Sequence, residues 1–319
     1  MSTYVFGPVR SGRLGLSLGL DLLGARICSF DCLYCEVGPT DALTTAQKPY
    51  VPATRLLGEL SGFAASGPPA LDAVTLGGLG EPCLNTDMDR IIDGCRKILP
   101  GIPVAVLTNS SLLSDPAVRK RLVGADVVLP SMDTLVPEEF ATINLPHRNV
   151  SLEAIRRGLL EFRTEFDGRM YLEILVLEGI NDSEDNLARL LDFCRDVRPD
   201  RVDVVTMTRP GAWPQARPAS SATLARFRES LGAVLTETTD GHGPAALRGR
   251  SADCPGRRDA SEGIVSRVAA SLGGRPQTIA QLSAALGLAE GDIRRAVETL
   301  VREKKIQAKA AFDDVFYFG

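Results

Sequence analysis

Three cysteines lie close together in the sequence, at positions 28, 32 and 35 of the stretch CSFDCLYC. No other pair among the seven cysteines is as close. A loop with this spacing can wrap one face of a compact inorganic cluster and offer it three thiolates. A [4Fe–4S] cluster usually takes four cysteines, so three would leave one iron open to an outside ligand. The spacing therefore predicts a cluster held by Cys28, Cys32 and Cys35, with one iron free to do chemistry.

Two other interpretations of these cysteines stay open. A structural zinc site needs four ligands, but the nearest further cysteine is Cys83, and neither His147 nor His242 lies near the cysteine stretch. Buried cysteines or a disulfide are the second alternative, although neither requires a tight, repeated spacing. The spacing thus favours the iron–sulfur cluster over both.

The cysteine stretch, with Tyr34 before its last cysteine, resembles the cluster loop of radical S-adenosylmethionine (SAM) enzymes. Residues 4–9 (YVFGPV) and 15–21 (GLSLGLD) resemble the subgroup of Fe–S oxidoreductases related to the wyosine-forming tRNA enzymes. The resemblance covers roughly residues 1–245. It implies a [4Fe–4S] cluster, SAM, a 5′-deoxyadenosyl radical that abstracts hydrogen, and a reductant such as flavodoxin or ferredoxin.

The substrate is less well defined by the resemblance. The wyosine-forming enzymes carry extra N-terminal cysteines for a second cluster, and this chain has none before Cys28. Modification of a peptide or protein is therefore at least as good an expectation as modification of RNA.

Apolar, strand-like segments alternate with helical segments along the first three quarters of the chain. The expected strands are 16–23, 73–77, 104–108, 126–130, 171–177 and 201–207, and the expected helices are 55–63, 87–99, 115–123, 151–166, 183–197 and 222–234. Six such units predict a parallel sheet covered on both faces. A flat, doubly wound sheet is one possibility, but the resemblance favours a partial (β/α)6 TIM-like barrel, with its active residues after the strands' carboxyl ends.

Several polar residues and glycines follow these strands directly. The resemblance assigns SAM contacts to a glycine-rich turn after the second strand, to residues after later strands and to Tyr34, namely Gly78, Gly80, Glu81, Pro82, Asn109, Ser131, Asp133, Leu177 and Asn181. A plain tight turn, and capping of loop backbone by Asn or Asp, are the alternatives.

Four further residues are substrate candidates, Cys83, His147, Arg148 and Trp213. The favoured interpretation of Cys83 is a small, buried packing residue. His147 and Arg148 could instead lie in a surface loop, and packing is the more common role of a tryptophan.

The composition changes after residue 240. Residues 241–260 form a basic linker, and 261–319 predict three helices and two strands, an order that resembles a winged helix-turn-helix. The predicted third helix carries Arg294 and Arg295, which could reach a DNA groove, but it also carries four acidic residues. Protein binding and packing are thus open alternatives. A redox-sensing Fe–S regulator that binds DNA is the alternative function.

Bulk properties narrow the function classes. The 319 residues are 44% apolar, carry a net charge of −4 and have a pI near 5.4, as in ordinary soluble proteins. This charge argues against a strongly basic nucleic-acid surface. No secretory signal and no segment of membrane-spanning length is evident. An odd number of cysteines fits a reducing compartment, so we expect a cytoplasmic protein with no membrane partner.

Overall fold

The central element is a seven-stranded sheet, seen here in a computed structural model that describes residues 4–67, 70–238, 261–272, 276–311 and 314–319. Its strand order is β1-β2-β5-β6-β7-β8-β9. Six strands are parallel, with the bounds β2 Gly15–Asp21, β5 Ala73–Gly77, β6 Val104–Thr108, β7 Val127–Pro130, β8 Arg169–Leu175 and β9 Arg201–Val205. The first strand, β1 (Val5–Ser11), pairs antiparallel with β2 at one edge.

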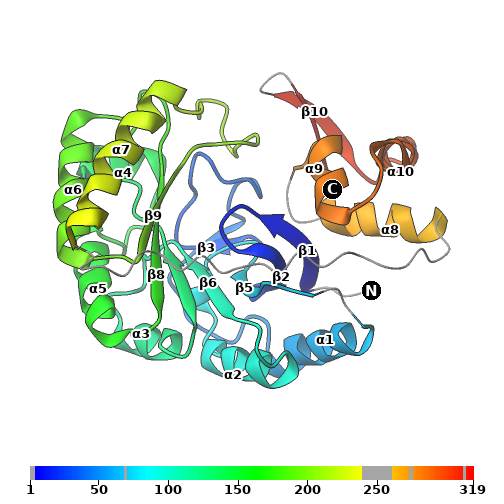
Figure 1. The fold of residues 1–319 in the computed structure, drawn as a ribbon, viewed down its shortest axis with the longest axis horizontal. Helices are drawn as coiled ribbons and strands as arrows, with labels where there is room; N and C mark the ends of the chain where they lie inside the picture. The colour runs from blue at the N-terminus through cyan, green and yellow to red at the C-terminus, as the bar shows by residue number, and fades with distance from the viewer. Residues whose placement is uncertain (1–3, 68–69, 239–260, 273–275, 312–313) are drawn as a thin grey trace.

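Helices cover the outer face of this curved sheet (Figure 1). The connecting helices are α1 Ala53–Ala65, α2 Met88–Ile98, α3 Pro116–Leu122, α5 Leu152–Glu165, α6 Glu184–Val197 and α7 Ser221–Thr238. Their apolar stripes pack on strand residues such as Leu18, Leu76 and Leu172 in one large core. A second, smaller cluster fills the inner face, where Leu14 packs against Ala73, Ala105 and other small or apolar side chains. The predicted partial (β/α)6 barrel is confirmed.

Local chemistry explains several element boundaries. The Ser151 and Ser183 hydroxyls accept the backbone N–H of Ala154 and Asn186, so each serine caps the helix that follows it; the Ser151 cap agrees with the sequence, whereas α6 is capped by Ser183 and not by Asn181. Strand β1 was not predicted, because a Gly7–Pro8 pair and a bulge interrupt its alternation. The short elements β3 (Ile27–Cys28), β4 (Ala42–Leu43), η1 (Pro82–Leu84) and α4 (Pro137–Ile143) were not predicted either, since periodicity needs longer segments.

The C-terminal segment forms a separate small core. It contains α8 (Ser261–Leu272), α9 (Ile279–Leu286) and α10 (Glu290–Arg302), followed by the antiparallel hairpin of β10 (Gln307–Ala311) and β11 (Asp314–Phe318). Val268, Leu282 and Ile293 lie at the centre of this core. Helices α8 and α9 lie beside β1 (Figure 1). The order of elements agrees with the expectation, and its assignment as a winged helix stays a prediction.

The predicted linker, 241–260, lies outside the described residues. Among the helices described, none is both long and apolar enough to span a bilayer.

Candidate functional site

The three cysteines follow β2, at the end of the barrel where the parallel strands terminate. We call residues 26–38 the cysteine loop. Burial is the main cause that raises the pKa of the Cys28 thiol to about 12, and the charges of Glu81 and Cys35 contribute to the same shift. Burial is also the main cause that raises the pKa of Cys32, followed by its neighbours Cys28 and Cys35. The three cysteines lie in one short loop, and the Cys35 N–H donates to the Cys32 carbonyl at 3.1 Å. Their ionisation calls for a positive centre beside them.

Side-chain amides point at two of these sulfurs. Asn109 Nδ2 lies 3.5 Å from Cys28 Sγ, and Asn144 Nδ2 lies 3.5 Å from Cys32 Sγ. Hydrogen bonds to ligand sulfur are one of the means by which proteins set the potential of an iron–sulfur cluster. Asn144 was not predicted, because its partners Cys32 and Asp133 lie far from it in the sequence.

A single ion and a cluster make different demands on these thiols. Within the described part of the chain, no three His, Cys, Asp or Glu side chains form a group that could hold one metal ion. A cubane cluster distributes its thiolates over separate iron atoms, so they need not meet at one point. Three neighbouring thiols that receive amide donors fit such a cluster.

The glycine-rich turn after β5 packs directly against the cysteine loop. Gly78 has a φ of +110°, which other residues rarely adopt. At Gly80 a Cβ atom would lie 1.8 Å from the carbonyl oxygen of Ile27. The N–H of Glu81 donates to that same oxygen at 3.1 Å. The structure thus brings together the two segments that were predicted to share a rim.

Asp21 stabilises this turn through hydrogen bonds from backbone N–H groups. Its carboxylate accepts the backbone N–H of Leu23 and Gly24 at 3.1 Å, and that of Leu79 at 3.3 Å. Burial nevertheless raises the pKa of Asp21, because three donors do not fully replace the lost hydration.

The Glu81 side chain is buried and joins the turn to β6. Its Oε1 accepts from Thr108 Oγ1 at 2.7 Å and from the Cys83 N–H at 3.0 Å, while its Oε2 accepts the Asn109 N–H at 2.7 Å. Burial raises its pKa as well. Pro82 begins η1 and is also buried. Both carboxylate oxygens accept from the protein's own donors, so Glu81 positions the backbone around it.

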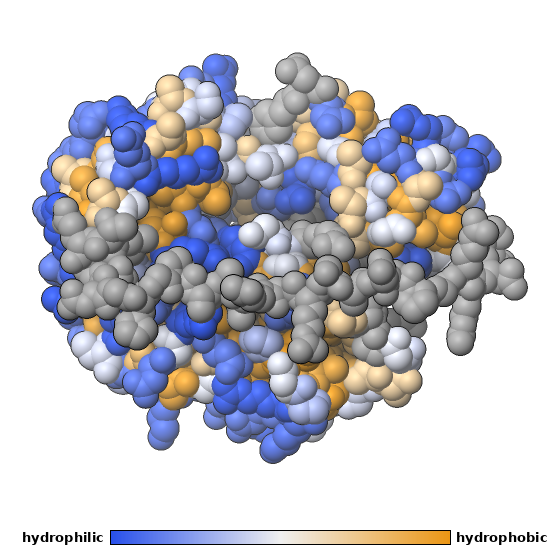
Figure 2. Space-filling view, in the orientation of Figure 1, coloured by the Kyte–Doolittle hydropathy of each residue, from blue (hydrophilic) through white to orange (hydrophobic). Residues whose placement is uncertain are grey.

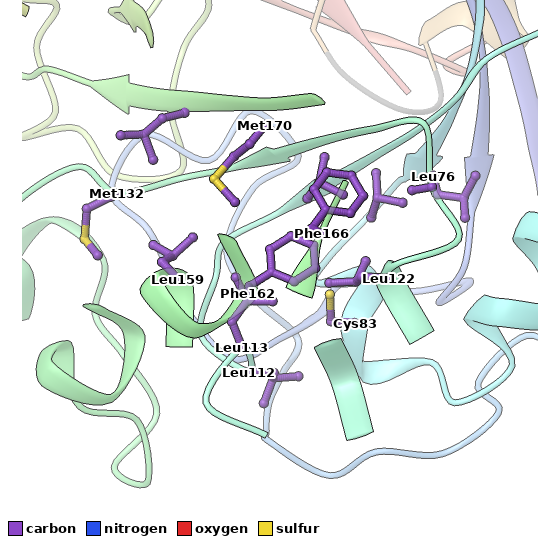
Figure 3. Packing of buried hydrophobic residues seen from close by; sticks show 14 of the residues in the cluster. Leu76, Cys83, Leu112, Leu113, Leu122, Met132, Leu159, Phe162, Phe166 and Met170 are labelled. Carbon is purple, nitrogen blue, oxygen red and sulfur yellow. The ribbon is translucent and has the colours of Figure 1, made fainter. Parts of the chain in front are cut away.

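Cys83 lies in the core. Its side chain is 1% exposed, its thiol donates to Thr108 Oγ1 at 3.4 Å, and burial raises its pKa. Figure 3 shows it within the cluster of buried apolar side chains. This is the position of a packing residue, the favoured of the two interpretations of this thiol.

A second buried network ties the cysteine loop to β7 and β8. Asp133 accepts from Tyr34 Oη at 2.6 Å, from Asn144 Nδ2 at 2.9 Å and from the Leu175 N–H at 3.0 Å. Burial raises its pKa despite these donors. Asn181 accepts the N–H of Leu177 and donates to the carbonyl of Asp133, each at 2.8 Å. Asp133 and Asn181 therefore hold the ends of these strands in register with the loop.

Ser131 follows β7 directly and is half-buried. Its backbone carbonyl accepts from Ser110 Oγ at 2.8 Å. It lines a small cavity together with three other predicted contacts, Tyr34, Asn109 and Asp133. The structure therefore brings these four residues together.

The loop after β9 lies on the cysteine loop. Trp213 donates its backbone N–H to the carbonyl of Leu33 at 3.2 Å, and its ring packs in a cluster with Leu33 and Leu177. Arg209 Nη1 lies 3.0 Å from a Glu36 carboxylate oxygen. A Cβ at Gly211 would approach the Leu33 carbonyl to 2.7 Å. This close packing covers one side of the cysteines.

The two remaining substrate candidates, His147 and Arg148, lie in different surroundings. The backbone N–H of His147 donates to the carbonyl of Ser29 at 2.8 Å, so His147 lies against the cysteine loop. Arg148 is exposed. A groove of about 930 Å³ opens beside this region, and its lining includes Leu33, Leu145, Ile180, Gln215 and Arg217.

The chain matches the Radical SAM superfamily over residues 22–191. It is 37% identical over 207 residues to a UPF0026 protein of Synechocystis, covering 65% of this chain and 76% of that one. It is also 37% identical over 205 residues to a Brachyspira hyodysenteriae protein named GTPase Obg, covering 64% of this chain and 30% of that protein. The chain thus spans less than a third of that relative, whose named activity lies outside what the match shows.

Among solved structures, a radical SAM methyltransferase from Sphaerobacter thermophilus is similar, with a TM-score of 0.52 and 16% identity. The match covers 68% of this chain and 63% of that one. At this identity the likeness concerns the fold alone.

Proposed function

The chain belongs to the radical SAM superfamily, and from this premise we propose that Cys28, Cys32 and Cys35 hold a [4Fe–4S] cluster with one iron open to SAM. Members of this superfamily are enzymes that use both groups. Together the bound cofactors supply a 5′-deoxyadenosyl radical, which removes a hydrogen atom from the substrate. The supporting observation is the packing of the cysteine loop on the Gly78–Gly80 turn, with 3.1 Å between the Glu81 nitrogen and the Ile27 oxygen.

The protein's own residues would position these groups. Asn109 and Asn144 direct amide donors at two of the sulfurs. Glu81, Asp133 and Asn181 are buried and fix the strand ends around the loop, so little reorganisation is needed when the cofactors bind. The backbone of Gly78 and Gly80, where no side chain intervenes, and the nearby side chains of Tyr34, Ser131 and Asn109 are the proposed contacts of SAM.

The proposed enzyme also requires a substrate and a reductant. We propose a peptide, protein or RNA substrate and a flavodoxin- or ferredoxin-type reductant, since enzymes of this superfamily need both a substrate and an electron donor. The comparisons give no support to a DNA-binding regulator. A cytoplasmic location and a winged helix in 261–319 stay predictions.

Anaerobic reconstitution tests the proposal. Purified protein is loaded with iron and sulfide, mixed with SAM and dithionite, and assayed for 5′-deoxyadenosine by mass spectrometry. The wild type should form it, and Cys32→Ala should not. Cys95→Ala, which removes a thiol from the core outside the site, is the matched control and should retain the activity. Absence of product from wild-type protein carrying four irons would refute the proposal.

A further inference from the structure

We propose that the inner wall of the barrel binds a peptide group of the substrate through a charge-balanced set of side chains. This inference rests on the proposed function of the same site. We call the set the inner charged wall, and its members are Arg13, Glu36, Glu173, Arg201, Asp203 and Arg209.

Strand alternation places the centre of this wall inside the barrel. Strands β8 and β9 run in parallel, with Glu173 opposite Asp203 and Tyr171 opposite Arg201. The intervening residues Leu172 and Val204 pack into the outer core under the helices. Because successive side chains point to opposite faces, Glu173 and Asp203 face inward. Tyr171, on the same face, packs in the inner apolar cluster.

One ion pair crosses the open side of the barrel, and a second lies along β9. Arg13 lies in the turn between β1 and β2, and its guanidinium contacts the Glu173 carboxylate. Figure 1 shows this turn pointing from the sheet edge toward β8 and β9. Arg201 stacks on the Tyr171 ring at 3.8 Å and donates to Asp203 Oδ2 at 2.7 Å. Burial lowers the pKa of Arg13, while Asp203 and Glu36 oppose that shift.

The wall lies next to the proposed cofactor site. Glu173 forms a backbone bridge with Ser131, a predicted SAM contact. At the rim, Arg209 pairs with Glu36, the residue after Cys35. Within the described residues, the Arg209 Nε is buried without a hydrogen-bond partner, so this arginine keeps one unpaired donor beside its ion pair with Glu36. Figure 2 shows the molecule hollowed between the barrel and the C-terminal helices, with hydrophilic residues in the hollow.

The charged side chains of the wall contribute little to the stability of the fold. A partly buried ion pair adds little to stability, because desolvation and solvent screening offset much of the attraction. Elsewhere the inner face carries small and apolar side chains, together with the hydroxyl pair of Ser17 and Thr75 and with Arg169, which donates to Tyr171 Oη at 3.4 Å. The six side chains are between 18% and 35% exposed, so a ligand inside the barrel can reach them. Ligand recognition accounts for this placement better than folding does.

The charge pattern selects the class of ligand. Within the inner charged wall three arginines face three carboxylates, so these six side chains balance in charge and offer both donors and acceptors. Arg169, on the same face of β8 beside Tyr171, adds one positive charge next to the wall. A peptide segment, with its N–H and C=O groups or a terminal amine and carboxylate, can use both kinds of partner. An RNA backbone would bring phosphates next to Glu36, Glu173 and Asp203, and the net charge of −4 gives it no attraction.

Transfer of deuterium identifies the substrate class. Cells grown in D2O supply two separate pools, partially digested protein and total RNA. Each pool is incubated with the reconstituted enzyme, SAM and dithionite. When the enzyme breaks a substrate C–D bond, the deuterium atom passes to the 5′ carbon and is found in 5′-deoxyadenosine. We expect the protein pool to give at least tenfold more deuterated 5′-deoxyadenosine than the RNA pool.

Isosteric variants test the wall itself. Asp203→Asn and Glu173→Gln should each lower the deuterated fraction of the product at least tenfold with the protein pool. Arg195→Gln, which breaks the surface pair of Arg195 with Asp192, is the control and should leave that fraction unchanged. Thermal unfolding checks that each variant is folded.

Some outcomes would overturn the inference alone. One is transfer of deuterium from the RNA pool only, and another is transfer from neither pool while 5′-deoxyadenosine still forms. A third is an undiminished deuterated fraction of the product in both folded variants. Absence of all 5′-deoxyadenosine would instead overturn the proposed function, and the inference with it.

Discussion

Replacing Gly80 by alanine perturbs the contact that joins the glycine turn to the cysteine loop. The added Cβ would lie 1.8 Å from the Ile27 carbonyl oxygen, where real Cβ atoms essentially never come under 3.0 Å. The two segments must therefore separate by about 1.2 Å, the difference between 3.0 and 1.8 Å. This movement breaks the 3.1 Å hydrogen bond from Glu81 to Ile27, which is worth about 1 kcal/mol.

A displacement of about 1 Å at a reacting centre can lower a rate by about 100-fold. We therefore expect Gly80→Ala to bind less iron and to form 5′-deoxyadenosine about 100-fold more slowly than wild type. Gly62→Ala is the matched control, because Gly62 lies in α1 with no atom within 4 Å of an added Cβ. That change should stabilise the helix by about 0.5–1 kcal/mol and leave the rate unaltered. A Gly80→Ala enzyme with wild-type iron content and rate would refute the reasoning.

Three further changes have expected outcomes. Arg209→Gln removes the positive charge paired with Glu36, the residue after Cys35, and leaves that carboxylate unpaired. The change should lower the midpoint potential of the cluster, measured by spectroelectrochemistry, whereas Arg226→Gln on an exposed pair should not; an unchanged potential in Arg209→Gln would count against this reasoning. Asn144→Leu removes donors from Cys32 and Asp133 and should lower the free energy of unfolding by about 1–3 kcal/mol in urea titrations, and an equally stable variant would show that these bonds matter little. Burial raises the folded-state pKa of Asp21 above its ordinary 3.8, so the stability it contributes is present below pH 3.8 and is lost as the pH rises through the raised pKa. The unfolding free energy of wild type minus that of Asp21→Asn should accordingly fall between pH 4 and 7, and a difference that rises with pH would contradict this sign.

Much of the barrel could be predicted from the sequence, because continuous apolar strands and amphipathic helices leave a periodic signal. The edge strand β1 could not, since Gly7 and Pro8 hide its alternation. The inner charged wall also escaped prediction. Arg201 and Asp203 look like solvent-facing residues of a strand, and only the closure of the sheet turns that face inward.

The candidate site was predictable only in part. The cysteine spacing and the glycine turn are local patterns and can be found by inspection. The use of Asp133 and Asn181 in a buried network depends on contacts between distant segments, such as the bond from Tyr34 to Asp133. Asn144 was missed for the same reason, because its partners Cys32 and Asp133 come from other elements.

Electron paramagnetic resonance of the dithionite-reduced protein, recorded with and without SAM, tests the central claim most directly. If Cys28, Cys32 and Cys35 hold a [4Fe–4S] cluster with an open iron, the reduced protein will show the signal of that cluster, and SAM will change it. A signal that SAM leaves unchanged, or one that persists when all three cysteines are replaced by alanine, would contradict the claim.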